Sequence, residues 1–114
     1  MFVFLEVENN VQRGHIVYYN SSVQKWAIAS DDNSLVGVVS SDPENSEDKV
    51  IAKVIFAGSA YAIADRAIPD EGGNLAVQNG KVYVDNTKDC GIISPSILNM
   101  DQRQENDLVM VHIR

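Results

Sequence analysis

Short runs of apolar residues, each closed by a glycine, an asparagine or a polar turn, follow one another along the whole chain. Their length and their content of β-branched residues are typical of β-strands. The alanine-rich run after residue 57 is the one segment where a helix competes, but Gly58 and the β-branched residues around it favour a strand. The predicted strands span 1–8, 15–19, 24–29, 35–40, 50–56, 59–64, 75–78, 81–85 and 107–114.

The first predicted strand has two different faces, because side chains alternate along a strand. One face carries only apolar residues: Met1, Val3, Leu5 and Val7. The other carries two aromatic residues and two carboxylates: Phe2, Phe4, Glu6 and Glu8. Two phenylalanines beside each other are unusual on a surface that stays in contact with solvent. We expect either another segment of the chain or another subunit to pack on Phe2 and Phe4.

The order of the predicted strands is written twice, over residues 11–40 and 70–94. Each copy runs from a glycine and an apolar strand, through a turn, to a strand led by lysine and then to Gly-apolar-apolar-Ser. The copies agree in pattern more than in identity. This internal repeat predicts one all-β domain over 1–114, a small antiparallel sandwich or barrel with little helix. Its expected core is Val17, Ile28, Val38, Val54, Val77, Val82 and Ile92.

Three connecting segments carry distinct signals. Asn79-Gly80 predicts a type I′ hairpin between 75–78 and 81–85, since both central residues of that turn need positive φ. Residues 41–48 hold four carboxylates and Pro43 without apolar periodicity, which predicts a solvated, mobile loop. The segment 94–103 is ambiguous, with Ser96 as a possible cap for one helical turn.

Composition narrows the function classes. The 114 residues suit one domain, and the formal net charge is −7, with nine scattered basic residues. A phosphate-binding surface needs clustered lysine and arginine, so no nucleic-acid partner is expected. No apolar run is long enough to cross a bilayer, so no membrane partner is expected, and the apolar N-terminus is interpreted as a strand. Cys90 is the only cysteine and is interpreted as a small core residue in a protein assembled in a reducing cytoplasm.

The polar residues do not form a recognisable reactive site. The carboxylate pairs Asp31-Asp32 and Glu47-Asp48 lie in polar loops, whereas acid–base catalysis needs a desolvated cleft. A calcium site in 42–48 is the alternative interpretation, but its spacing is not that of an EF-hand. His15 and His112 each stand alone, without further zinc ligands nearby in sequence. We expect no catalytic residue, no metal and no cofactor, and therefore no enzyme.

Three aromatic residues are the candidates for an interface: Phe2, Phe4 and Trp26. Core packing is the default interpretation of the single tryptophan, and a protein or carbohydrate contact is the alternative. Together these three residues supply a large aromatic surface for a small chain, and each buried phenylalanine contributes roughly 1.5–3 kcal/mol. This favours a homo-oligomer, with a trimer as the expected form.

The order of these motifs resembles a recurrent module of tailed-phage virion proteins. The matching segments are Gly14–Val17, Lys25–Ala29, Val36–Ser40, Val50–Gly58 and Gly73–Val77, within residues 11–94. Two groups share the pattern. One comprises capsid decoration, or cement, proteins with a β-tulip-like fold, which form trimers on the outer capsid. The other is a module near the end of tail fibres and spikes, which includes self-cleaving chaperone modules.

The resemblance implies a structural protein of the virion that contacts the major capsid protein from outside. A chain that starts at Met1 and ends after 114 residues, with no fibre shaft, favours the decoration group over the fibre group. No residue matches the cleavage residues of the chaperone modules, so none is assigned. A strand at the N-terminus departs from the flexible arm expected of a decoration protein. The alternatives are a self-cleaving module and a receptor- or glycan-binding tail component that uses Trp26 or Tyr61.

Overall fold

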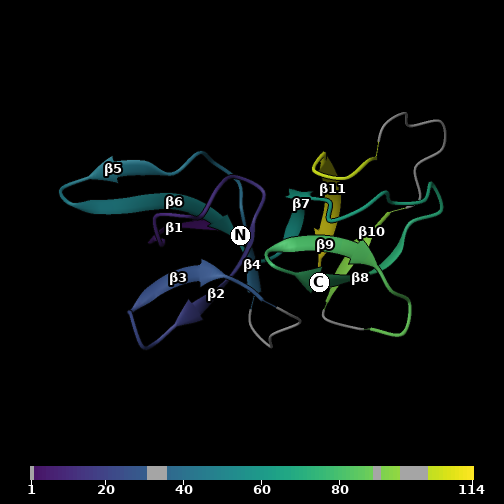
Figure 1. Cartoon of the computed structure of the whole chain (residues 1–114), viewed down its shortest axis with the longest axis horizontal. Helices are drawn as coiled ribbons and strands as arrows, with labels where there is room; N and C mark the ends of the chain where they lie inside the picture. Colours follow the sequence, from purple (N-terminus) through teal and green to yellow (C-terminus); the bar gives the residue numbers. More distant parts are fainter. Residues whose placement is uncertain (1, 31–35, 89–90, 96–102) are drawn as a thin grey trace.

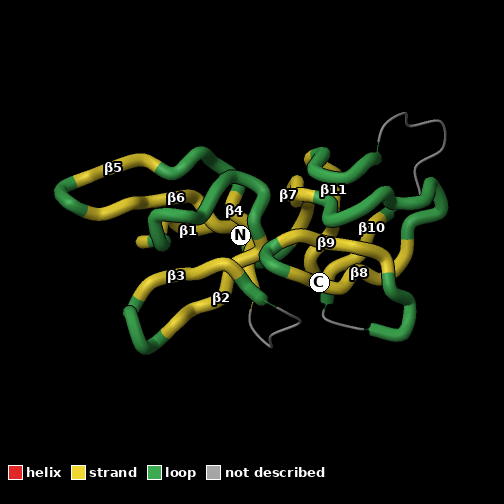
Figure 2. Tube along the Cα trace, viewed as in Figure 1, coloured by secondary structure: helices red, strands yellow, loops and turns green. Residues whose placement is uncertain are grey.

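The computed structural model describes residues 2–30, 36–88, 91–95 and 103–114, and these residues form eleven strands and no helix (Figures 1 and 2). The strands are β1 (Phe2–Glu6), β2 (Ile16–Asn20), β3 (Lys25–Ile28), β4 (Val36–Val39), β5 (Glu44–Ser46), β6 (Lys49–Ile55), β7 (Gly58–Ile63), β8 (Gly73–Gln78), β9 (Lys81–Val84), β10 (Ile92–Ser94) and β11 (Leu108–Ile113). The alanine-rich segment is therefore a strand, as predicted. Met1, Asp31-Asp32, Cys90 and Ser96 lie outside the described residues.

The strands form two antiparallel sheets, which pack as a small sandwich and confirm the predicted all-β class. The first sheet, on the left of Figure 1, has the order β1-β6-β4-β2-β3, with β5 added beside β6. The second, on the right, has the order β7-β11-β10-β8-β9. The described part of the chain thus has its N-terminal half in one sheet and its C-terminal half in the other.

The two sheets share one topology. When β5 is set aside, the strands of each sheet follow the spatial order first, fifth, fourth, second, third. Each sheet also curls until its two outermost strands touch through a parallel bridge, Val7 to Trp26 in the first and Ala64 to Val82 in the second. The sequence repeat itself stays a prediction, but the shared strand order is a property of the fold.

Each sheet encloses an apolar cluster. The first cluster contains Val7, Val11, Val17, Val39, Ala52 and Val54. The second fills the inner face of the second sheet and extends to four residues of the first half of the chain, Ile16, Ala29, Val36 and Val38. Six of the seven predicted core residues are buried, and the seventh, Ile28, is half-buried against the first cluster. Burial of the β-branched residues on one side of each strand is the main stabilising contribution.

The Asn79-Gly80 hairpin is confirmed. The φ angles are 51° at Asn79 and 76° at Gly80, as a type I′ turn requires. The turn joins β8 to β9 with Gln78 opposite Lys81 and Leu75 opposite Val84.

The prediction of a loop over 41–48 was wrong. Residues Glu44–Ser46 form β5, which pairs antiparallel with β6. The chain reverses at Glu47 and Asp48, whose φ angles of 50° and 68° give a second turn with two left-handed residues. Sequence patterning missed this hairpin because its stabilisation comes from backbone pairing to β6, while all the side chains of β5 are exposed. An exposed strand needs no apolar alternation.

Candidate functional site

The phenylalanines of β1 are exposed to solvent. The exposed fraction is 51% for Phe2 and 66% for Phe4, and no described segment of the chain covers them. Their ring centroids lie 6.1 Å apart in an edge-to-face arrangement. The Lys53 Nζ atom lies 4.0 Å from the centroid of the Phe2 ring, a cation–π geometry. We expected either another segment of the chain or another subunit to pack on Phe2 and Phe4. No segment among the described residues does so.

The backbone of β1 is also open on one side. The Val7 N–H donates to the Val50 carbonyl, and β1 pairs with β6 from Phe2 to Glu6. In an antiparallel ladder, residues alternate between bonding to the partner and pointing away from it. The N–H and C=O groups of Phe2 and Phe4 therefore point away from β6. We call these backbone groups the open edge of β1, because no described strand pairs with them.

A shallow depression of about 290 Å³ lies next to Phe4. Its lining crosses β6 from β1 to β5: Phe4, Ser41, Asp42, Glu44, Ser46 and Ile51. The Ser41 hydroxyl oxygen accepts a hydrogen bond from the Lys53 N–H at 2.9 Å, which fixes this segment against β6. Sequence patterns could not predict that two carboxylates, Asp42 and Glu44, lie beside Phe4, because that proximity depends on β1 and β5 pairing with the same strand.

Trp26 does not belong to this surface. Its ring is half-buried in the core of the first sheet, with centroids 5.7 Å from Tyr19 and 5.1 Å from Phe56. Its backbone forms the bridge that closes the sheet. The structure therefore brings Phe2 and Phe4 together and packs the third interface candidate, half-buried, against the first apolar cluster.

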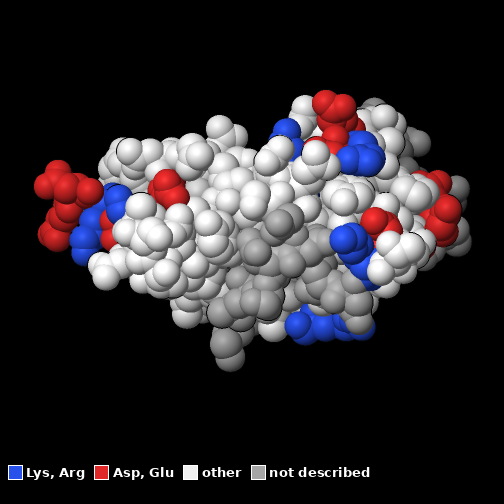
Figure 3. Space-filling view, turned by 60° about the horizontal axis from the view of Figure 1, so that its bottom comes forward, with Lys and Arg blue, Asp and Glu red and all other residues white. Residues whose placement is uncertain are grey.

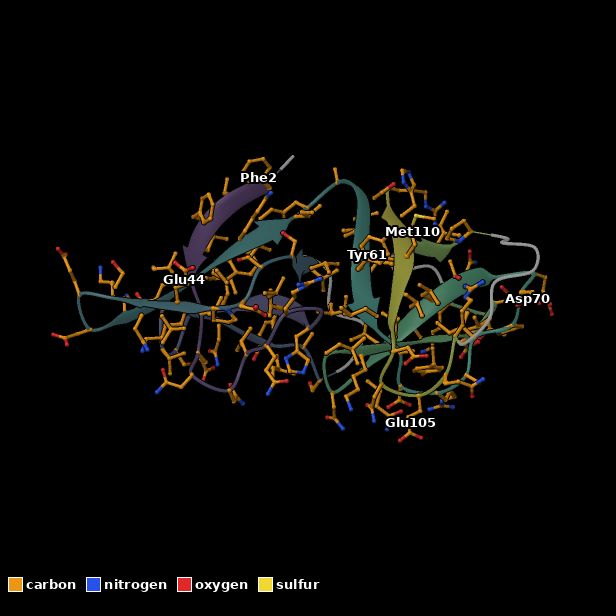
Figure 4. All side chains as sticks on the ribbon, turned by 90° about the horizontal axis from the view of Figure 1, so that it is seen from above. Phe2, Glu44, Tyr61, Asp70, Glu105 and Met110 are labelled. Carbon is orange, nitrogen blue, oxygen red and sulfur yellow. The ribbon has the colours of Figure 1, made fainter. Side chains whose placement is uncertain are left out.

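The second sheet exposes an aromatic residue at the position that corresponds to Phe4. Phe4 and Tyr61 each lie three residues before the closing bridge, and they pair with Lys53 and Met110 respectively. Tyr61 is 57% exposed on β7 (Figure 4). Strands β1 and β7 thus each expose an aromatic side chain three residues before the bridge that closes their sheet. The shared topology explains this correspondence, which the sequence pattern did not reveal.

The two histidines lie in different surroundings. His15 is only 8% exposed, and its Nδ1 atom accepts a hydrogen bond from the Gln12 N–H at 2.9 Å. Burial, and secondarily the charge of Lys81, lowers the pKa of His15 below its ordinary value of 6.5. His112 is exposed on β11. Within the described ranges, no three His, Cys, Asp or Glu side chains gather as a metal site would require.

Arg103 is a buried polar residue that sequence reasoning missed. Its side chain is 4% exposed, and one guanidinium nitrogen donates to the Ser94 hydroxyl. The other terminal nitrogen, Nη1, has no hydrogen-bond partner in the described part of the protein. Its backbone carbonyl accepts the Ile68 N–H at 2.8 Å. The interactions that the structure shows link the segments around residues 68, 94 and 103, which is a structural role.

Charge is distributed unevenly over the surface. In the view of Figure 3, acidic and basic side chains gather toward the two ends of the long axis, and few lie between them. One charged end is the β5–β6 hairpin. No helix among the described residues has the length and apolar character to cross a membrane.

The chain matches no family model, no curated protein and no solved structure. The candidate site therefore rests on the geometry of β1 and its surroundings.

Proposed function

We propose that this protein is a non-catalytic structural protein of a virus particle, a decoration or cement protein that binds the outer surface of a phage capsid. The observation that carries the proposal is the open edge of β1 with its two exposed phenylalanines. An exposed apolar surface of this kind marks an interaction site more often than a site of chemistry. The resemblance to phage virion modules supplies the identity of the partner, the major capsid protein.

A cement protein needs a complementary surface that symmetry repeats many times. Each contact adds only a few kcal/mol, but many linked contacts hold a shell through avidity. The net charge of −7 supports an outer position, since an inner surface would meet packaged nucleic acid and favour basic residues. In this proposal the protein assembles in the host cytoplasm and acts as a homo-oligomer, with the trimer of the decoration group as its expected form.

Substitutions on two surfaces of the first sheet test the proposal. Replacing Phe2→Ser and Phe4→Ser should sharply reduce the number of copies bound per particle, because each exposed phenylalanine loses its apolar contact. Replacing Glu47→Gln and Asp48→Gln at the hairpin tip is the matched control and should leave occupancy unchanged. Glu44 is unsuitable as a control because it lines the depression beside Phe4. Occupancy is measured by gel densitometry of purified particles and by particle reconstruction.

Two results would count against the proposal. If the hairpin substitutions remove the protein from particles and the phenylalanine substitutions do not, the binding surface is wrong. If particles that lack the protein withstand heat and chelation as well as complete particles, the cement role is wrong.

Exposed Tyr61 supports a second candidate, a receptor- or glycan-binding component of a phage tail. Antibody labelling of particles separates the two, because it locates the protein on the head or on the tail. A Tyr61→Ala variant that loses binding on a glycan array would favour the tail candidate. The self-cleaving alternative predicts a precursor and a shorter product on a denaturing gel.

A further inference from the structure

The open edge of β1 combines three features, and a sheet edge that has all three rarely stays without a partner strand in a monomer. The backbone groups of Phe2 and Phe4 have no partner strand among the described residues, their aromatic side chains are exposed, and no charged residue lies between Phe2 and Leu5. Proteins protect the edges of their sheets with charges, prolines or bulges, because an unprotected edge accepts another strand. None of these devices occurs at Phe2–Leu5. The edge is therefore suited to receive a strand.

The sequence of the edge is complementary to itself. Phe2-Val3-Phe4 reads the same in both directions, so antiparallel pairing about Val3 places each phenylalanine opposite a phenylalanine of the second copy. In that register the backbone groups of Phe2 and Phe4 form the hydrogen-bonded pairs, and Val3 meets Val3 in the closer, non-hydrogen-bonded pair. Aromatic pairs that face each other across strands are stabilising.

The charges beside the strand fit the same register. Lys53 Nζ lies over the Phe2 ring, whereas Asp42 and Glu44 line the depression beside Phe4. One end of the edge is thus basic and the other acidic. Antiparallel pairing brings the Phe2 end of one copy to the Phe4 end of the other, so that unlike charges approach each other twice.

We propose that two copies of this chain associate through the open edges of their β1 strands, antiparallel and about a twofold axis at Val3. The first sheets of the two copies then join as β6-β1-β1-β6. The contact occupies the same open edge that the proposed function assigns to capsid binding, but it forms between free copies of the chain and is tested without particles. It is compatible with a trimer formed through other surfaces, since it would then link two trimers. The paired edges are short, so the association is weak in solution.

Strand β7, at one edge of the second sheet, is a poorer partner for β1. The Ile63 N–H of β7 already donates to the Gly14 carbonyl at 3.0 Å, which leaves a shorter open stretch. Its neighbour across the ladder at Tyr61 is Met110, which carries no charge to match Lys53 or Glu44. Tyr61 is nevertheless as exposed as Phe2, so it provides a matched control.

Disulfide trapping tests the register. Val3→Cys is made in a Cys90→Ser background, so that residue 3 holds the only thiol. Cα atoms in a non-hydrogen-bonded pair lie about 4.5 Å apart, within the range that a disulfide spans. Mild oxidation should convert the 12.5 kDa chain into a covalent dimer of twice that mass, reversible by reductant. Tyr61→Cys in the same background should stay monomeric.

Sedimentation separates the backbone contribution from the aromatic one. The N–H of Phe4 points away from β6, so Phe4→Pro removes a donor of the open edge without removing a hydrogen bond to β6. Phe4→Ser removes the ring and keeps the donor. Both should weaken dimerisation of the native chain at least about tenfold, and the proline should weaken it more. Circular dichroism checks that each variant keeps its strands.

The outcomes are decisive in either direction. Efficient trapping of Val3→Cys, together with monomeric Tyr61→Cys, supports the twofold pairing. A native chain that remains monomeric up to millimolar concentration, with no trapping of Val3→Cys, overturns it. Preferential trapping between Val3→Cys and Tyr61→Cys chains in a mixture would show head-to-tail pairing of β1 with β7, and it would also overturn the proposal.

Discussion

Two tight turns with the same left-handed backbone lie in opposite surroundings. The Asn79-Gly80 turn packs against the first sheet, where the Ile16 N–H donates to the Gly80 carbonyl at 2.8 Å and the Gly80 N–H donates to the Ala29 carbonyl at 2.6 Å. The Glu47-Asp48 turn projects from the far end of the first sheet, at the left of Figure 1, and both of its residues are exposed.

The comparison shows that surroundings, and not turn geometry alone, decide which residues a turn accepts. A Cβ atom on Gly80 would lie 2.7 Å from Ile28 Cγ2 and 3.1 Å from His15 Cδ2, so the packed turn has no room for a side chain. At the projecting turn, Glu47 and Asp48 occupy left-handed conformations with their side chains in solvent. The left-handed conformation costs free energy at both residues, but no neighbouring atom clashes with their side chains.

The largest effect should come from Gly80→Ala. The left-handed φ of 76° costs about 1 kcal/mol for alanine, and the contact with Ile28 adds about 1–3 kcal/mol of overpacking. We expect the free energy of unfolding to fall by about 2–4 kcal/mol in urea denaturation.

Gly58→Ala is the matched control for that substitution. Gly58 has a φ of 96°, but a Cβ atom there would meet nothing within 4 Å. Its loss should be limited to the backbone cost of about 1 kcal/mol. Equal losses at Gly58 and Gly80 would show that packing of the turn against the first sheet adds no constraint.

Acidification should lower the free energy of unfolding by a smaller amount, because of His15, which packs beside the Gly80 turn. Burial lowers the pKa of His15 in the folded protein below 6.5, so the unfolded chain binds more protons than the folded one as the pH falls below that value. The stability is fully present above pH 6.5 and declines as the pH falls toward the folded pKa. Urea denaturation at successive pH values measures this slope.

His15→Asn tests the assignment of that slope. Asparagine keeps an acceptor for the Gln12 N–H but does not titrate. The variant should lose the part of the pH dependence that lies just below pH 6.5, whatever its stability at neutral pH. An unchanged slope would assign the effect to other groups.

The smallest effect should be a gain at the projecting turn. Asp48→Gly relieves a left-handed residue with a φ of 68°, and the gain is partly offset by the greater flexibility of glycine in the unfolded chain. We expect stabilisation by about 0.5 kcal/mol. Ser46→Gly, in β5, should instead destabilise slightly, because that residue pairs with Lys49 in an extended strand. A loss of stability at both positions would mean that the hairpin does not need a left-handed residue at 48.

Several features followed from the sequence alone. Alternating apolar residues predicted most of the strands, and Asn79-Gly80 predicted its hairpin, because both signals act over a few neighbouring residues. Six of the seven predicted core residues were likewise correct, since residues such as Val17, Val54 and Val82 each lie within a strong apolar run. The open phenylalanine surface was anticipated from the alternation of β1, but its lack of a cover could not be known from a single strand.

The remaining features were decided by the tertiary structure, because they depend on which strands become neighbours. The hairpin of β5 has no apolar signal and exists through pairing with β6. Asp42 and Glu44 lie beside Phe4 only because β1 and β5 flank the same strand, and Trp26 is half-buried only because its strand closes the sheet against Val7. Local patterns specify which face of a strand is apolar, whereas long-range pairing determines what that face meets.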